Sequence, residues 1–173
     1  MRDSYFAHEN QLQQWIEAAE SIKVRFGLEK ALGYLIGEKF YNIVSDNLYS
    51  RKMIRIIAEG KNQPDYNPMR EYGEGRFKRI INLNEQYKEC EGRVIETEHI
   101  LIEFTKLIKG SFDQYEIKSY FDSHPRLGAH GHTTSEEQHA FLIQQGAIEH
   151  SIETEVEDAL ILGDMMKYFQ IMF

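Results

Sequence analysis

Apolar residues recur at steps of three and four along most of this chain, and that spacing constrains the fold more than any other feature. In residues 9–26 they fall on one face of a helix: Leu12, Trp15, Ile16, Ala19, Ile22 and Phe26. Similar spacing predicts further helices over residues 28–44, 47–59, 76–91, 93–109, 111–121 and 134–169. An alternative for residues 76–109 is one helix with Gly92 inside. No run of alternating apolar and polar residues is bounded by turns, so we predict no strand. The expected fold is all-α, a bundle of about five to seven helices.

Length and composition place this bundle in a single globular domain. A chain of 173 residues with 42% hydrophobic residues is long enough to bury a core, so we expect one domain over residues 1–173. The only cysteine is Cys90, which excludes an intrachain disulfide and fits a reducing cytoplasm. We expect no secretory signal and no membrane span, because the N-terminus has no apolar core region and charges interrupt the apolar stretches.

Three local features concern the helices and their packing. Gly33 and Gly37 lie four residues apart in a predicted helix, where they lower its intrinsic stability but let another element approach closely. We interpret them as a packing notch, with a hinge as the alternative. Ser111 and Gln114 have the spacing of a capping box, which predicts a helix start there. The C-terminus is too apolar for a loose tail; its apolar residues are Tyr168, Phe169, Ile171, Met172 and Phe173. We expect it to pack into the core or against a second copy, which favours an oligomer.

Charge is distributed unevenly along the chain. The net charge is −8, yet residues 50–80 contain eight Lys/Arg against four Asp/Glu, and residues 127–173 contain one lysine against eight acids. An acidic chain makes general nucleic-acid binding an unfavourable interpretation, whereas its basic middle and acidic end suit each other, within one chain or across a homodimer. The residues we expect to bind a partner are Arg51, Arg55, Arg76, Arg79, Glu149, Glu153 and Glu157.

Five of the seven histidines lie in residues 122–164, which begin with a histidine-containing loop at 122–134. A first alternative function is therefore the binding of a divalent transition metal, since imidazole and carboxylate together suit zinc, iron, nickel or manganese. The candidate ligands are His130, His132, His139, His150, Glu153 and Glu157.

The motif Glu-x-x-His occurs twice, at Glu96–His99 and Glu136–His139. Two such motifs resemble those of carboxylate-bridged dimetal bundles, but a full-length helix between them is missing here. On a helical wheel Glu96, His99, Glu103 and Lys106 form a stripe opposite the apolar face. We therefore interpret the first motif as part of a solvated stripe containing a Glu103–Lys106 pair.

Arg126 and His132 are separated by five residues, and this spacing resembles the Arg-x(4–6)-His element of HEPN ribonucleases. That resemblance implies a small all-α dimer in which Arg126 and His132 are catalytic and act on RNA. The polar residue that usually follows the arginine is replaced here by Leu127. The segment around Tyr66, with further aromatic and basic residues up to position 79, has the composition of a surface that stacks on single-stranded RNA.

Nucleophilic chemistry has little support in the sequence. Cys90 lies beside Glu89 and Glu91, whose charges raise a thiol pKa. No Gly-x-Ser-x-Gly motif or phosphate-binding glycine loop is present. The function we expect is thus non-enzymatic: a cytoplasmic all-α protein that acts by self-association or by binding another protein.

Overall fold

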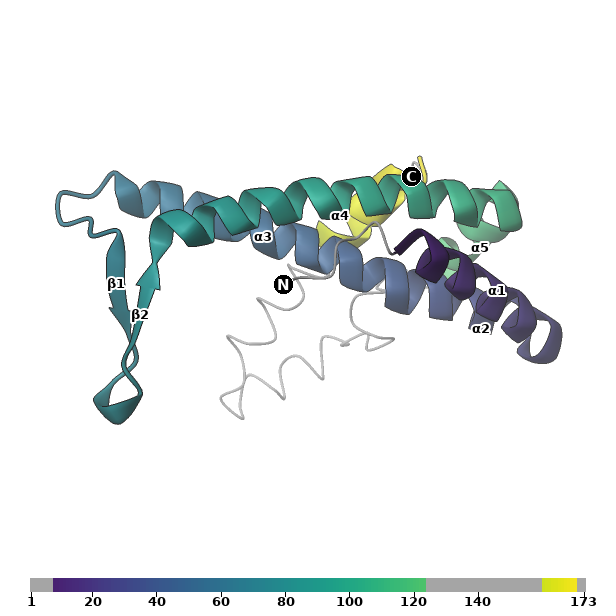
Figure 1. The fold of residues 1–173 in the computed structure, drawn as a ribbon. Helices are drawn as coiled ribbons and strands as arrows, with labels where there is room; N and C mark the ends of the chain where they lie inside the picture. Colours follow the sequence, from purple (N-terminus) through teal and green to yellow (C-terminus); the bar gives the residue numbers. More distant parts are fainter. Residues whose placement is uncertain (1–7, 124–159, 171–173) are drawn as a thin grey trace, which may run out of the picture. The chain divides into compact units, whose positions relative to one another are not determined.

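The computed structural model describes residues 8–123 and 160–170 (Figure 1). The elements, in chain order, are α1 (His8–Phe26), α2 (Leu28–Leu32), the π-helix η2 (Gly33–Phe40), α3 (Tyr41–Lys61), β1 (Met69–Tyr72), the 3-10 turn η3 (Gly75–Phe77), β2 (Arg79–Asn82), α4 (Leu83–Ser111) and α5 (Gln114–Ser123). Residues 160–168 are helical as well. The all-α prediction is confirmed, since the described residues are mostly helical and the only sheet among them has two strands.

Two compact units make up the chain. The first unit combines Met1–Val44 with Ile100–Phe173, and the second is Ser45–His99. The long helices α3 and α4 each contribute residues to both units. The expectation of a single domain over residues 1–173 stays a prediction.

Aromatic rings form the centre of the first unit. Phe40 is fully buried, with ring centroids 5.7 Å from Phe104 and 4.9 Å from Phe169. Trp15 packs on Phe104 at 5.5 Å, and Phe121 packs on Phe169 at 5.9 Å. Burying such rings is worth about 1.5–3 kcal/mol each, so this cluster is a major source of the unit's stability. The prediction that the C-terminus packs into the core is confirmed for Phe169; residues 171–173 lie outside the described ranges.

The predicted glycine notch is confirmed, and its occupant is Tyr120 of α5. A Cβ added to Gly37 would lie 2.7 Å from the Tyr120 hydroxyl oxygen, and one added to Gly33 would lie 3.7 Å from it. The buried position raises the pKa of Tyr120 to about 12, and the Glu29 carboxylate adds a smaller contribution in the same direction. Gly37 is therefore the residue that admits the Tyr120 hydroxyl, whereas a side chain at Gly33 would meet it at an ordinary van der Waals distance.

The beginning of α5 corrects one expectation. The predicted capping pair is Ser111 and Gln114, but the cap is formed by Asp113 and Glu116. The Glu116 amide donates to Asp113 Oδ1 at 2.7 Å, and the Asp113 amide donates to Glu116 Oε1 at 3.2 Å. Since α4 continues to Ser111, the chain can only restart a helix after that residue, which moves the cap two positions along.

Other expectations about the elements were wrong in detail. Residues 69–72 and 79–82 pair as an antiparallel hairpin, although we predicted no strand and placed 76–82 in a helix. Helix α3 begins at Tyr41 rather than at residue 47. The alternative of one helix with Gly92 inside is confirmed, since α4 is continuous from Leu83 to Ser111. The strands are four residues long, too short for alternation to be visible in the sequence. Within the described residues, no helix has the length and apolarity needed to cross a membrane.

Candidate functional site

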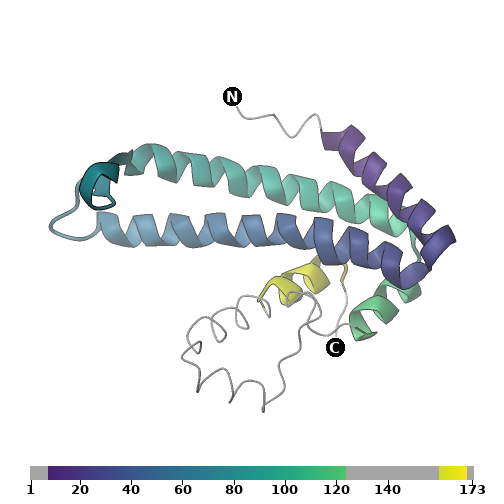
Figure 2. The same ribbon diagram turned by 90° about the horizontal axis from the view of Figure 1, so that it is seen from below.

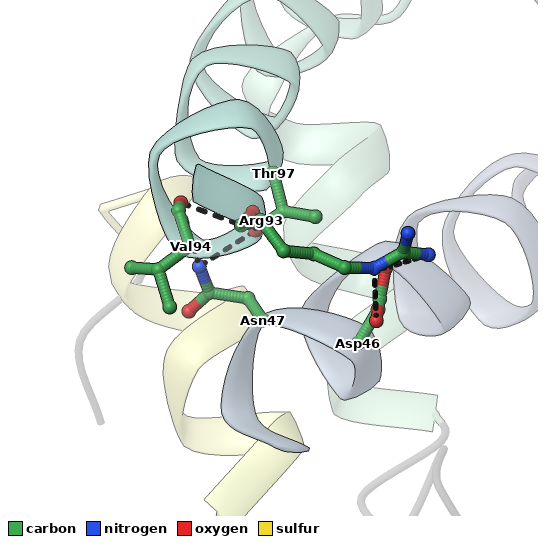
Figure 3. A network of polar contacts seen from close by, with 5 residues as sticks. All are labelled: Asp46, Asn47, Arg93, Val94 and Thr97. Carbon is green, nitrogen blue, oxygen red and sulfur yellow. Dashed lines mark hydrogen bonds and ion pairs between the residues drawn. The ribbon is translucent and has the colours of Figure 1, made fainter. Parts of the chain in front are cut away.

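The second unit consists of an antiparallel helix pair and the hairpin that joins its two helices. Its helical parts, from α3 and α4, lie side by side (Figure 2). Between them Asn47 is almost fully buried, and its Nδ2 donates to Thr97 Oγ1 at 2.8 Å and to the Val94 carbonyl at 3.2 Å (Figure 3). The Thr97 hydroxyl donates in turn to the Arg93 carbonyl at 2.7 Å. A buried amide satisfied in this way fixes which residues of α3 face which residues of α4.

Two ion pairs lie beside this buried contact. The Arg93 guanidinium donates from Nε to Asp46 Oδ2 at 2.8 Å and has its Nη2 2.7 Å from the same oxygen. Arg51 forms an ion pair with Glu98, and its Nε donates to Asn47 Oδ1 at 2.9 Å. All four charged side chains are partly exposed, so each pair adds less than about 1 kcal/mol, and their main effect is on alignment. Arg51, predicted to bind a partner molecule, is therefore engaged within its own unit.

Hydrogen bonds connect the two ends of the hairpin at the start of α4. The Leu83 amide donates to the Pro68 carbonyl at 2.7 Å, and the Tyr66 hydroxyl donates to Asn84 Oδ1 at 3.0 Å. Asn82 caps α4, because its Oδ1 accepts from the amides of Asn84 and Glu85 at 3.0 and 3.2 Å. These bonds hold the hairpin by its two ends.

The turn of the hairpin requires glycine. Gly73 has a φ of +88°, and a Cβ there would lie 2.9 Å from the Phe77 carbonyl oxygen. Gly75 also has a positive φ, of +69°. Because side chains larger than hydrogen are strained in this backbone region, the two glycines allow the chain to reverse between β1 and β2.

The hairpin exposes large apolar side chains. Every residue from Asn67 to Ile80 is exposed, and in Figure 1 the hairpin stands away from the helices of its own unit. Phe77 is 79% exposed, Ile80 62%, Tyr72 52% and Met69 48%. A two-stranded sheet is marginally stable by itself, and several exposed large apolar residues in so short a segment are typical of a binding surface.

The same hairpin is basic. Arg70, Arg76, Lys78 and Arg79 outnumber Glu71 and Glu74. Lys78 Nζ lies 3.9 Å from Glu71, and the Arg76 guanidinium lies 5.9 Å from the Phe77 ring centre. Among the described residues, neither Arg70 nor Arg79 has a carboxylate partner. The surface therefore combines aromatic rings with guanidinium groups able to bind an anionic partner.

The predicted partner-binding arginines are divided between two places. Arg51 and Arg55 lie on α3, whereas Arg76 and Arg79 lie on the hairpin. The acidic residues predicted to meet them, Glu149, Glu153 and Glu157, lie outside the described ranges.

The predicted metal and catalytic residues also fall outside these ranges. They are Arg126, His130, His132, His139, His150, Glu153 and Glu157. Of the histidine-containing loop at 122–134, only residues 122 and 123 are described, and these belong to α5. Within residues 8–123 and 160–170, no three histidine, cysteine or acidic side chains are grouped so that they could hold a metal ion.

The solvated stripe on α4 matches its prediction in part. His99 and Lys106 are exposed, and the Lys106 ammonium lies 3.4 Å from a Glu103 carboxylate oxygen, as expected for the predicted pair. Glu96 is half-buried. The stripe thus supplies ordinary surface contacts on this helix.

Cys90 has the raised pKa that its acidic neighbours predict, but the leading cause differs. Burial raises the pKa of this thiol most, and Glu89 adds to the effect, while Arg93 opposes it. The thiolate is the reactive form, so a raised pKa makes Cys90 a poor nucleophile.

Sequence reasoning did not identify the hairpin as a structured surface. The available signal was the Gly73-Glu74-Gly75 turn between two short segments, one of which contains the β-branched pair Ile80 and Ile81. The contact of Asn47 with Thr97 had no local signal, because these residues lie 50 positions apart. Comparisons with protein-family models, curated proteins and solved structures found no match for this chain.

Proposed function

We propose that this protein acts by self-association or by binding another protein, and that the hairpin over residues 69–82 is the contact surface. The observation that carries the proposal is the exposure of Met69, Tyr72, Phe77 and Ile80 on a hairpin that also displays four basic side chains. Exposed apolar groups supply the free energy of association, and arginines supply orientation and selectivity. The proposal includes a cytoplasmic location and a homodimer.

The test compares two matched double variants. Tyr72→Ser with Phe77→Ser removes two rings from the hairpin, whereas Val24→Ser with Phe26→Ser removes two side chains that are 86% and 69% exposed at the end of α1. Size-exclusion chromatography with light scattering should give the wild type and the α1 variant a mass above the 20.4 kDa of one chain. The hairpin variant should move toward that mass.

Two results would contradict the proposal. A wild type that stays monomeric at high concentration excludes self-association. In that case the partner-binding half is tested by comparing the proteins recovered with each variant. Equal recovery with the hairpin variant and the α1 variant would exclude the hairpin as the contact surface.

The two alternatives from the sequence stay predictions. Metal binding is tested by elemental analysis of untagged protein, and a clearly substoichiometric content would exclude it. A ribonuclease using Arg126 and His132 is tested by comparing RNA cleavage by wild type and His132→Ala, where equal activity excludes that histidine from the chemistry. The exposed rings of Tyr72 and Phe77 would also suit stacking on unpaired bases, so the hairpin variant belongs in that assay too.

A further inference from the structure

The strand register gives the hairpin two chemically different faces. Cross-strand partners share a face, and successive residues alternate between faces. Tyr72 pairs with Arg79 and Arg70 pairs with Ile81, so these residues lie together on what we call the basic face: Arg70, Tyr72, Arg79 and Ile81. The other face has Met69, Glu71, Ile80 and Asn82.

Charge on the basic face is uncompensated within the described residues. Its two arginines have no carboxylate partner there, and the neighbouring Glu71 belongs to the other face, where Lys78 Nζ lies 3.9 Å from its carboxylate. Tyr72 is 52% exposed, pairs directly with Arg79 across the strands, and lies two residues from Arg70 on the same strand. A guanidinium donates two parallel hydrogen bonds to a carboxylate, so a partner rich in carboxylates with some apolar side chains fits this face best.

The chain itself contains a segment with that composition. Residues 148–158, which we call the acidic segment, contain five acids and no lysine or arginine: Glu149, Glu153, Glu155, Glu157 and Asp158. Ile148, Ile152 and Val156 recur every four residues beside the acids. Like charges four residues apart repel one another in a helix, and bound arginines remove that repulsion.

We propose that the basic face of one copy binds the acidic segment of a second copy. This inference rests on the proposed function and specifies its partner. Because every copy carries both surfaces, a two-fold dimer would make the contact twice, and each contact would place two guanidinium groups against several carboxylates. A different acidic protein or an RNA are the occupants that the experiment must exclude.

The experiment uses charge reversal in the full-length chain. One variant carries Arg70→Glu and Arg79→Glu, which makes the basic face acidic. The other carries Glu149→Lys, Glu153→Lys and Glu157→Lys, which makes the acidic segment basic. Each variant alone would oppose like charges in both contacts, so its dimer dissociation constant should rise by roughly 100-fold or more.

Mixing the two variants should restore the dimer. In the mixed pair the acidic hairpin of one chain meets the basic segment of the other, and the remaining contact is unchanged from wild type. A control with Lys30→Glu and Lys88→Glu changes the charge equally at exposed positions of α2 and α4, and it should dimerise like wild type. Sedimentation velocity gives the masses, and far-UV circular dichroism checks that each variant keeps its helices.

Each other outcome overturns the inference in a distinct way. A wild type that is monomeric excludes a second copy as the partner of the basic face. If that monomer binds a labelled oligouridine and the Arg70→Glu, Arg79→Glu variant does not, the partner of the basic face is RNA. If the two charge-reversal variants dimerise like wild type, the protein self-associates, but through a surface other than the basic face and the acidic segment. Variants that are monomeric both alone and mixed show that the charges do not pair between copies.

Discussion

Replacing Gly37 by alanine tests the notch between η2 and α5 quantitatively. Two effects oppose each other. Alanine is favoured over glycine in a helix by about 1 kcal/mol. The added Cβ would lie 2.7 Å from the Tyr120 hydroxyl, too close for van der Waals contact, and such overpacking costs about 1–3 kcal/mol. We expect a net loss of about 1 kcal/mol in the free energy of unfolding.

Gly92 provides the matched control, because it lies inside α4 and nothing is within 4 Å of a Cβ added there. Gly92→Ala should therefore stabilise the protein by about 1 kcal/mol, which puts the two variants about 2 kcal/mol apart. Urea unfolding followed by far-UV circular dichroism resolves that difference.

A double variant identifies the clashing atom. Tyr120→Phe removes only the hydroxyl, so Gly37→Ala should cost about 1–2 kcal/mol less in that background than in the wild type. The reasoning is refuted if Gly37→Ala stabilises as much as Gly92→Ala, or if removing the hydroxyl leaves the cost of Gly37→Ala unchanged. Either result would mean that the glycine is not what admits Tyr120.

Three further predictions concern single contacts. Burial raises the pKa of Tyr120 from 10.0 to about 12, so the folded protein favours the neutral phenol. The free energy of unfolding should therefore be unaffected by this group below pH 10 and fall by roughly 2–3 kcal/mol as the pH rises from 10 to 12. Unfolding free energies measured over a pH series should show this loss in the wild type and not in Tyr120→Phe. Asn47→Ala should lower the free energy of unfolding by about 1–3 kcal/mol, because it breaks a buried hydrogen bond. Asp46→Ala should lower it by less than about 1 kcal/mol, because the ion pair with Arg93 is partly exposed. Thermal or urea unfolding measures both, and equal losses would contradict the burial argument. Asp113→Ala should cost about 1 kcal/mol as the loss of an N-cap, and Ser111→Ala less than about 0.5 kcal/mol; a larger effect at Ser111 would restore the cap that the sequence predicts there.

Periodicity predicted the helices well where one face packs on a core. Residues 9–26 were expected to be helical, and α1 spans His8–Phe26 and ends at Gly27, whose φ is +100°. The apolar face of α4, opposite its polar stripe, consists of Val94, Leu101, Phe104, Leu107 and Ile108. Leu101, Phe104 and Ile108 are fully buried, whereas Val94 and Leu107 are half-buried. Such patterns succeed because a helix repeats every 3.6 residues, so the spacing of apolar residues in the sequence identifies the face that becomes buried.

The candidate site is only partly predictable from the sequence. Its composition is predictable, since arginines and aromatic residues gather between positions 66 and 79 of the chain. Their arrangement is not, because strands of four residues carry too few positions for alternation to register, and the pairing of Tyr72 with Arg79 depends on the turn between them.

The sequence by itself thus determined the helical class, the glycine notch and the uneven charge, because each depends on residues close together in the chain. Only the tertiary structure decided that Tyr120 fills the notch, that Asn47 aligns α3 with α4, and that the basic residues stand on a hairpin with two unlike faces. These facts join residues many positions apart, and the free energy that selects them comes from packing and from the satisfaction of buried polar groups.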